Sequence, residues 1–564
     1  MRIYLSVLLI IIPFFIGSCS KQQEDDSNSY NLNMSVGDRS SYLYQSIYIN
    51  FALTRSLEDE ALSMFIENID NMTEQKLFEK ISKISLETYQ YDKSEIIANR
   101  WLQIYPKSYN AYQFSISSSL ENNNLLKAEK YFIEYLKIIK PIDKNDYSKL
   151  IFSFLDNKNR LNVVNFFEKY LTNNDNRALN LNFIELLYSY NMPSKVIKHI
   201  DKLGTFGERN LVRLYASSHM LLKSYNKSQN ILESYLKGKK ASDRQVQFEL
   251  LEIYILNNQK EYRDKLIQKI LDSDPDNLDT IYQISRILFE SSMFDLSEKY
   301  LSSIVVESDE VNLLRGMIDY ERGSYIEAID HFDRITNYNY KILAIINKSS
   351  AMSKLESVSK AIDYLENFKK NYNDSSVRQR FALKQISLLN EKKLYKDIIT
   401  LTNKILDNNN DNINILYARA MAYESLDNIN LMEKDLKQVL KYDRKNANTL
   451  NALGYSLTIH TERYEEAYNF IHQAYHYDPG SPAILDSLAW ILYKKGEFTH
   501  ALIYAESSYI KDQDPEIVEH YCIILMENKL YEKLKEVIKK ESVRNSNNEN
   551  FIKKLHSIKD EIPL

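Results

Sequence analysis

The residues best suited to metal chemistry are His472 and His476, four apart in the stretch "FIHQAYHYD". On a helix this spacing places both imidazoles on one face, where an added carboxylate could complete a metal site. Ile471 and Ala474, however, occupy the face of the same helix that is expected to pack. The histidine pair is therefore expected in solvent, and we predict no metal site.

Other patterns that could support chemistry are incomplete. The acidic stretch "DNNNDNIN" (407–414) lacks the glycine and the terminal glutamate of a calcium loop, which favours an inter-helix turn. The sequence contains no G-x-G-x-x-G, Walker or H-E-x-x-H motif. A Ser/His/Asp set that meets only in space stays open, so an enzyme with its site in residues 147–242 is one alternative. We predict a non-enzymatic protein without a cofactor.

The chain has two cysteines, Cys19 and Cys522. Cys19 ends the stretch "MRIYLSVLLIIIPFFIGSC", in which Arg2 precedes an apolar run that is short for a permanent membrane span. This predicts a signal peptide over residues 1–18. An ordinary secretory signal with an incidental cysteine is the alternative. With Cys19 modified, Cys522 has no partner for an internal disulfide or a cysteine-based metal cage.

The ending Ile16-Gly17-Ser18-Cys19 resembles the lipobox of bacterial lipoproteins. The resemblance implies lipidation of Cys19 with diacylglycerol and a further acyl chain such as palmitate, and two or more chains hold a protein firmly on a bilayer. Ser20 follows the cysteine instead of an acidic residue, which by the same resemblance implies the outer membrane, facing the periplasm. The polar residues 19–40 are predicted to form a flexible tether.

The composition predicts long helices. The 564 residues include only 10 Gly and 9 Pro, too few for many tight hairpins, while 43 Tyr and 22 Phe can fill a large core. The 72 basic and 77 acidic residues leave a net charge of −5, and no basic groove is visible. We therefore predict that the chain binds no nucleic acid.

The elements that would position any site form an internal repeat. Tyr464 and Ala467 recur as Phe498 and Ala501, each after 34 residues. This pattern resembles the tetratricopeptide repeat (TPR), which has two antiparallel helices in each repeat. The resemblance implies an all-α solenoid of TPR-type helical hairpins, a right-handed superhelix of roughly a dozen helix pairs over residues 41–558. The clearest repeats are 309–340, 413–446, 447–481 and 482–514.

Small residues in this pattern are interpreted as crossing points, where one helix passes close to another. The aromatic residues are expected to begin second helices, and Pro479 and Pro515 to end them. Cys522 is expected to be buried at such a crossing. Between residues 147 and 242 the small residues mostly disappear, and the repeat register is left open. The residues assigned to repeat packing are Gly316, Ala328, Phe332, Gly454, Tyr464, Ala467, Ala474, Pro479, Ala489, Phe498 and Ala501.

Residues beside the crossing points of the first helices should face the concave wall of the solenoid. Such aromatic and polar side chains suit the binding of polypeptides. For Trp490 and Tyr493, packing within the stack is the alternative. A lysine–asparagine clamp for a carboxylate is not expected, because its places hold Asn451 with Tyr455. The candidate protein-binding residues are Tyr417, Met421, Asn451, Tyr455, Asp486, Trp490 and Tyr493.

Three stretches, residues 85–112, 450–502 and 514–522, resemble a narrower family. It comprises outer-membrane TPR lipoproteins that act as adaptors for a periplasmic carboxy-terminal processing protease. The resemblance implies a lipid-anchored scaffold that binds this protease and presents envelope proteins as substrates. The alternative is a scaffold for outer-membrane or cell-envelope assembly without a protease partner.

Overall fold

The computed structural model describes residues 36–562 except 55–57, 89, 140–146, 149, 152, 156–159, 205–206, 238–240, 276, 373 and 408–410. These described residues form 30 α-helices and no strand, which confirms the predicted all-α class. Thirty helices are enough for fifteen pairs, against roughly a dozen predicted. The predicted signal peptide and the lipidation residue Cys19 lie outside the described residues. No helix in the described ranges is long and apolar enough to cross a membrane.

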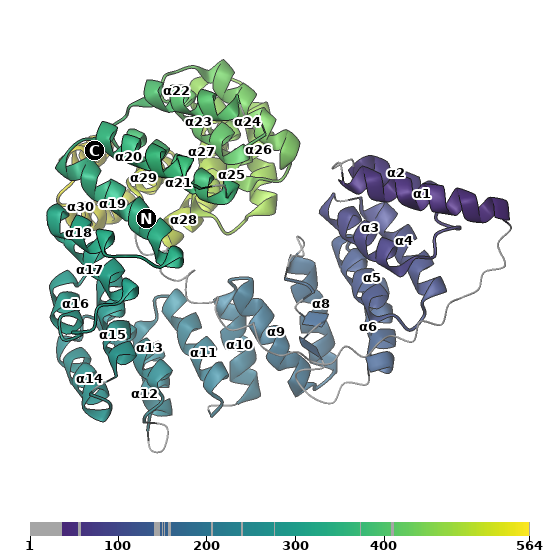
Figure 1. The fold of residues 1–564 in the computed structure, drawn as a ribbon, viewed down its shortest axis with the longest axis horizontal. Coiled ribbons are helices and arrows are strands. Elements are labelled where there is room, and N and C mark those ends of the chain that lie inside the picture. The colour runs from purple at the N-terminus through teal and green to yellow at the C-terminus, as the bar shows by residue number, and fades with distance from the viewer. Residues whose placement is uncertain are drawn as a thin grey trace. The chain divides into compact units, whose positions relative to one another are not determined.

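The chain divides into two compact units at residue 280. Within each unit, most consecutive helices contact one another in chain order (Figure 1). The helices of the first unit are α1 (Val36–Thr54), α2 (Glu58–Glu67), α3 (Gln75–Glu87), α4 (Tyr91–Ile104), α5 (Tyr109–Glu121), α6 (Leu125–Ile139), α8 (Arg160–Asn173), α9 (Arg177–Ser189), α10 (Pro193–Leu203), α11 (Arg209–Leu221), α12 (Tyr225–Tyr235), α13 (Arg244–Leu256) and α14 (Lys260–Ser273).

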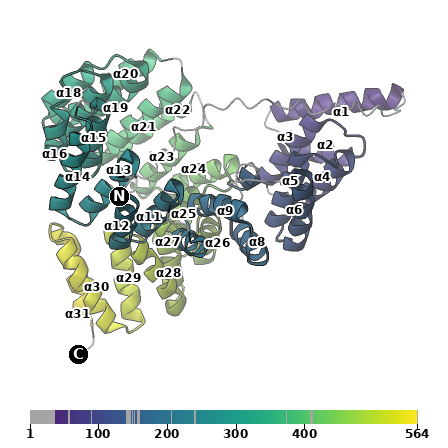
Figure 2. The same ribbon diagram turned by 90° about the horizontal axis from the view of Figure 1, so that it is seen from below.

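Helix α15 (Leu278–Glu290) includes the residue at which the division falls, and the second unit continues from it to the last helix, α31 (Figure 2). The further helices of the second unit are α16 (Phe294–Leu301), α17 (Asp309–Arg322), α18 (Tyr325–Asp333), α19 (Tyr338–Leu355), α20 (Val358–Lys370), α21 (Ser375–Glu391), α22 (Tyr395–Leu406), α23 (Ile413–Glu424), α24 (Ile429–Tyr442), α25 (Ala447–His460), α26 (Tyr464–Tyr477), α27 (Pro482–Lys494), α28 (Phe498–Lys511), α29 (Pro515–Glu527), α30 (Tyr531–Arg544) and α31 (Glu549–Asp560).

Helix α1 begins at Val36, inside the segment 19–40 that was predicted as tether. Residues 36–40 therefore belong to the first turns of a helix. Composition alone did not distinguish these turns from a linker, because a run of small and polar residues is compatible with both.

Small residues lie where two helices of a pair cross. A Cβ atom at Gly454 would come within 2.5 Å of Ile471 Cγ1 and 2.8 Å of the Ala467 carbonyl oxygen. At Gly316 a Cβ atom would meet the Phe332 ring at 2.5 Å. The five alanines assigned to repeat packing are fully buried: Ala328, Ala467, Ala474, Ala489 and Ala501. The helix axes can approach closely here because these positions carry little or no side chain.

The aromatic residues Tyr464 and Phe498 are the first residues of α26 and α28. Pro479 lies two residues beyond the end of α26 and is exposed. Pro515 was predicted to end a second helix, but it begins α29, four residues beyond the end of α28. Its structural equivalent is Pro482, which begins α27. Both prolines lie in a first turn, where the missing N–H has no helical acceptor to lose.

Most turns inside the helix pairs contain one residue in the left-handed conformation. Its successor donates a backbone hydrogen bond to the end of the first helix, as Leu530 N does to Leu525 O at 3.0 Å. Among the turns that the structure describes, glycine fills this position only at Gly323 and Gly496. Elsewhere the position is held by Asn123, Asn191, Lys223, Asn258, Ser292, Lys393, Asp427 and Lys529, with φ between 54° and 59°. Such turns form without glycine, although a Cβ atom makes the left-handed conformation less favourable.

Replacing Lys393 or Lys529 by glycine is expected to stabilise the second unit by about 0.5–1 kcal/mol, because glycine adopts positive φ without strain. Urea unfolding or hydrogen exchange of the neighbouring helices measures the gain. Lys392→Gly is the matched control, since Lys392 precedes Lys393 with a φ of −100° and should gain nothing. Equal effects at the two neighbouring positions would contradict this account of the turns.

The same turns give the register of residues 147–242, which the sequence left open. Asn191 separates α9 from α10, and Lys223 separates α11 from α12. The second helices here begin without the aromatic and alanine pattern in full: α10 starts at Pro193, and Ser228 takes the small buried position in α12. The Ser228 hydroxyl donates to the Ala216 carbonyl oxygen at 2.9 Å, so a serine serves as the crossing residue.

Candidate functional site

The candidate site lies on the first helices of successive pairs in the second unit. Helix α25 contacts α27, and α27 contacts α29. We call the face formed by α23, α25, α27 and α29 the first-helix wall. Tyr417 and Met421 come from α23, Asn451 and Tyr455 from α25, and Asp486, Trp490 and Tyr493 from α27. All seven predicted residues are at least half-buried.

Trp490 packs inside the stack more than it faces solvent. Its side chain is 8% exposed. One face of the indole stacks on the His520 ring, with centroids 3.9 Å apart and planes at 13°, and the ring also stacks on Tyr493 at 4.8 Å. The packing alternative therefore holds for Trp490. Tyr493 is only partly buried and keeps part of its surface on the wall.

Asp486 and His520 form a buried polar pair between α27 and α29. Asp486 Oδ2 lies 2.8 Å from His520 Nδ1, and the two residues are 5% and 7% exposed. Burial raises the pKa of the Asp486 carboxyl, while the hydrogen bond and charge of His520 oppose that rise. Sequence reasoning missed His520, although it follows Asp486 by one repeat length, because its side chain could equally have faced solvent.

Three polar atoms of the predicted wall residues are buried without a hydrogen-bond partner among the described residues. They are Asp486 Oδ1, Trp490 Nε1 and Asn451 Oδ1. Buried polar groups normally have partners, and an unpaired group costs about 1–3 kcal/mol. If one residue of the Asp486–His520 pair were removed, the other would stay buried with one hydrogen bond fewer. The pair is therefore a position of the wall where a substitution should be costly.

Tyr455 connects α25 to α29, the first helix of the pair that lies two pairs further along the chain. Its hydroxyl donates a short hydrogen bond to the Glu516 carboxylate on α29, past the intervening α27. Burial and this acceptor raise the Tyr455 pKa, so the hydroxyl stays protonated. Glu516 is exposed and was also missed from the sequence, because only the packing of α29 brings it to Tyr455. The wall thus presents a fixed carboxylate beside aromatic surface.

No family model matches the chain. Over 215 residues it is 29% identical to TPR repeat-containing protein PA4667 of Pseudomonas aeruginosa. The aligned part is 38% of this chain and spans 36% of the length of that relative. Together with the paired helices, this likeness decides the fold. The chain is an all-α TPR-type solenoid.

A solved TPR protein from Parabacteroides merdae is also similar. The similarity has a TM-score of 0.35 and 14% identity, and it covers 44% of this chain and 98% of that chain.

The two metal-like patterns of the sequence are the histidine pair on α26 and the acidic stretch before α23. His472 and His476 are exposed, and within the described ranges no three His, Cys, Asp or Glu residues are grouped to hold a metal. Of the acidic stretch 407–414, residues 408–410 are not described. Asn412 caps α23 by accepting from Ile415 N at 3.3 Å, as expected of an inter-helix turn.

Cys522 is buried in α29, as expected of a crossing residue. Its exposed fraction is 0%, and burial raises the thiol pKa to about 12. A thiol with so high a pKa holds almost no reactive thiolate near neutral pH. Cys522 is therefore a packing residue of the TPR core.

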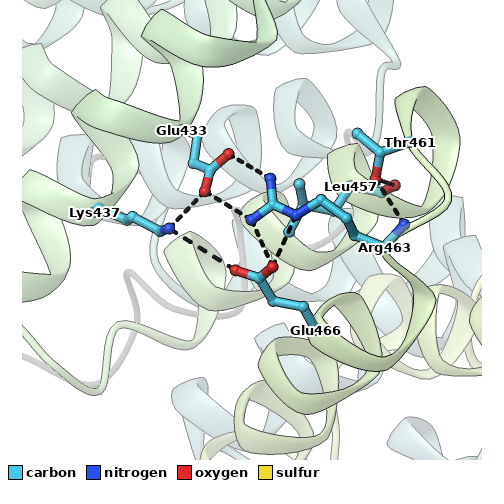
Figure 3. Close-up of polar contacts among 6 residues, drawn as sticks. All are labelled: Glu433, Lys437, Leu457, Thr461, Arg463 and Glu466. Carbon is cyan, nitrogen blue, oxygen red and sulfur yellow. Dashed lines mark hydrogen bonds and ion pairs between the residues drawn. The ribbon is translucent and has the colours of Figure 1, made fainter.

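An ion network locks one TPR pair to the next on the second helices (Figure 3). The Arg463 guanidinium donates to both oxygens of Glu433 at 2.8 and 3.0 Å, and through Nε to Glu466 at 2.8 Å. Lys437 lies 2.5 Å from Glu433 and 3.8 Å from Glu466. Hydrogen bonds from Arg463 hold the Glu433 pKa at about 2, below its ordinary value of 4.5.

The turn before α26 places Arg463 for this network. Thr461 ends the preceding helix and donates to the Leu457 carbonyl oxygen at 2.6 Å. Its hydroxyl also accepts from Arg463 N at 3.1 Å (Figure 3). The turn contains no residue with a positive φ among the described residues. It has three residues, like the turn between α27 and α28, so the spacing from Gly454 to Tyr464 exceeds that from Ala489 to Phe498 by one because α25 has 14 residues and α27 has 13.

Arg463→Met is expected to lower the free energy of unfolding around α24 and α26 by about 1 kcal/mol near neutral pH. Because the folded pKa of Glu433 is depressed, its contribution is present above about pH 4.5 and is lost as the pH falls towards 2. Urea unfolding at several pH values measures the loss. The exposed Arg444→Met should change little, and a loss from Arg463→Met that stayed constant down to pH 2 would contradict the assignment.

Proposed function

We propose that this TPR chain is a lipid-anchored scaffold of the bacterial cell envelope, which binds a protein partner on its first-helix wall. One observation carries the proposal: three successive first helices hold aromatic and carboxylate groups in fixed positions on one face. Tyr455 and Glu516 are fixed to each other, and Trp490 fixes the ring of Tyr493. A preformed aromatic and polar surface binds polypeptides with little loss of side-chain entropy.

The chemistry of the wall indicates what the partner presents. Glu516 is an exposed carboxylate at the start of α29, and the partly exposed ring of Tyr493 provides apolar surface at the end of α27, the preceding first helix. A basic or N–H-rich segment with an apolar side chain would complement this pair. The chain would act by binding, through the preformed surface of the wall.

We further propose a partner and a cellular location for this scaffold. Residues 450–502 resemble adaptors of a periplasmic carboxy-terminal processing protease, so we propose this protease and its envelope substrates as partners. Acylation of Cys19 would hold the scaffold at the outer membrane, and the residues after it would let the solenoid reach proteins in the periplasm.

Gentle crosslinking followed by affinity purification of the full chain from membranes should recover the protease. Glu516→Lys should reduce that recovery at least about tenfold, because it reverses the charge of the exposed carboxylate on the wall. Glu532→Lys is the matched control, with the same charge change on the second helix α30 at a side chain 90% exposed. Recovery of assembly proteins without any protease would reject the protease and favour an assembly scaffold, while equal recovery with both variants would reject the wall.

A further inference from the structure

The N-terminal helix α1 exposes a row of large apolar side chains. Tyr44, Ile47, Tyr48 and Phe51 are 67%, 60%, 37% and 49% exposed. Their spacing of three and four residues places them on one face of the helix. We call these four residues the α1 stripe. The terminal helices of solenoids usually present a polar outer face, so a stripe of this kind needs a partner.

The opposite face of α1 already has its partner. Ile49 and Ala52 are 0% and 1% exposed and join the core that includes Leu62 and Phe65 of α2. Gln45 Nε2 donates to Asn68 Oδ1 at 2.7 Å and fixes the rotation of α1 on that side. The stripe therefore cannot turn inward without breaking the core, and its exposure is a fixed feature of the fold.

Charged residues of both signs lie on the helices that follow α1. From Ser40 to Thr54 the sequence has no charged residue. Helix α2 begins with the exposed acidic residues Glu58, Asp59 and Glu60, and the exposed lysines Lys76, Lys80 and Lys83 follow one face of α3. Lys80 reaches α1, since its Nζ donates to Asn50 Oδ1 at 3.0 Å. An uncharged stripe of aromatic and aliphatic side chains with lysines on a neighbouring helix is typical of protein surfaces that lie in a lipid interface.

We propose that α1 lies on a phospholipid surface, with the α1 stripe at the boundary between headgroups and acyl chains and the lysines of α3 facing lipid phosphates. The inference rests on the proposed acylation of Cys19 for its proximity to the bilayer. Residues 20–35 separate Cys19 from α1, and 16 extended residues reach at most about 55 Å. The anchor thus confines α1 near the surface, where even weak contact of four side chains is sufficient.

The size of the stripe favours lipid over a second copy of the chain. Four partly exposed large side chains present on the order of 400 Å², whereas each partner of a stable protein interface buries about 800 Å². A bilayer needs no matching surface, so a narrow stripe can use its whole area there. Contact with the membrane at α1 would also set the orientation in which the first unit leaves the bilayer.

The test places a nitroxide label on Ile47→Cys in the acylated full chain, bound to vesicles of phosphatidylethanolamine and phosphatidylglycerol. Cys522 is 0% exposed and should stay unlabelled. Collision with a water-soluble nickel reagent should be at least about fivefold slower at position 47 than at Val543→Cys, a control residue that is 75% exposed. Equal collision rates at the two positions would overturn the proposal.

Two further arms separate the alternatives. Tyr44→Ser with Phe51→Ser should restore fast collision at position 47, and both residues are exposed enough for the fold to tolerate the change. When each vesicle carries one chain, position 47 should stay shielded from the nickel reagent. Shielding that is lost when the chains are diluted to this level would identify a second copy as the partner and overturn the lipid contact. The mass of the N-terminal peptide tests the anchor separately: an exposed label with acylated Cys19 refutes only the α1 contact, and a shielded label with unmodified Cys19 refutes only the anchor.

Discussion

Gly454→Ala is expected to lower the local free energy of unfolding of α25 and α26 by about 3 kcal/mol. The new Cβ atom would lie 2.5 Å from Ile471 Cγ1 and 2.8 Å from the Ala467 carbonyl oxygen. The Ile471 side chain could turn away, but the backbone oxygen cannot move without shifting α26. The two helices would therefore separate, and the pairs on either side would lose packing. Hydrogen–deuterium exchange of peptides from α25 and α26 measures the change.

Gly480→Ala is the matched control, because a Cβ atom there would meet only Asp478 Oδ1 at 3.6 Å, an ordinary contact. It should change stability by less than about 0.5 kcal/mol. If both glycine variants exchanged alike, the interpretation of Gly454 as a crossing point would be wrong.

His520→Ala is expected to destabilise α27 and α29 by about 3 kcal/mol near pH 8, because it leaves the Asp486 carboxylate buried without its hydrogen bond. It also removes the ring on which Trp490 stacks. The exposed His500→Ala, at a side chain 69% exposed, should stay within about 0.5 kcal/mol of the unchanged chain. Urea unfolding and exchange of the α27 and α29 peptides measure both variants.

The pH dependence of His520→Ala identifies the buried charge as the cause. The folded pKa of Asp486 is already raised by burial, and removing His520 raises it further. A carboxyl with a raised folded pKa is best tolerated below its unfolded pKa of about 3.9, and its penalty grows as the pH rises through the folded value. The destabilisation should thus be smaller near pH 4 than near pH 8. The double variant with Asp486→Asn should recover part of the loss, and an equal loss at both pH values would point to packing alone.

Where repeat packing needs one residue type, the sequence was sufficient to predict it. Gly454 with Ala467, and Ala489 with Ala501, are small because backbones cross there, so spacing alone located the helix pairs. Asn191 and Lys223 carry turns that the sequence could not reveal, because left-handed turns usually contain glycine and these residues are common on any exposed surface. The missing glycines, together with serine at a crossing point, hid the register of residues 147–242.

The candidate site was predicted less completely than the fold. Repeat spacing placed Tyr455, Asp486 and Trp490 on the wall, but it could not give their burial. Trp490 is covered because His520, 30 residues later, stacks on it, and Tyr455 is held because α29 brings Glu516 to its hydroxyl. Contacts between successive repeats depend on the rotation between neighbouring first helices. The sequence of a single repeat does not determine this rotation.

Binding on the first-helix wall is tested most directly by a photo-crosslinking amino acid introduced at Tyr493 in cells, with Tyr442 as the comparison. Tyr493 lies on the wall, and Tyr442 is 53% exposed on the second helix α24. Mass spectrometry should find a processing protease joined to position 493 and absent from position 442. Adducts to the same protein at both positions, or from position 442 alone, would show that the partner does not bind the wall.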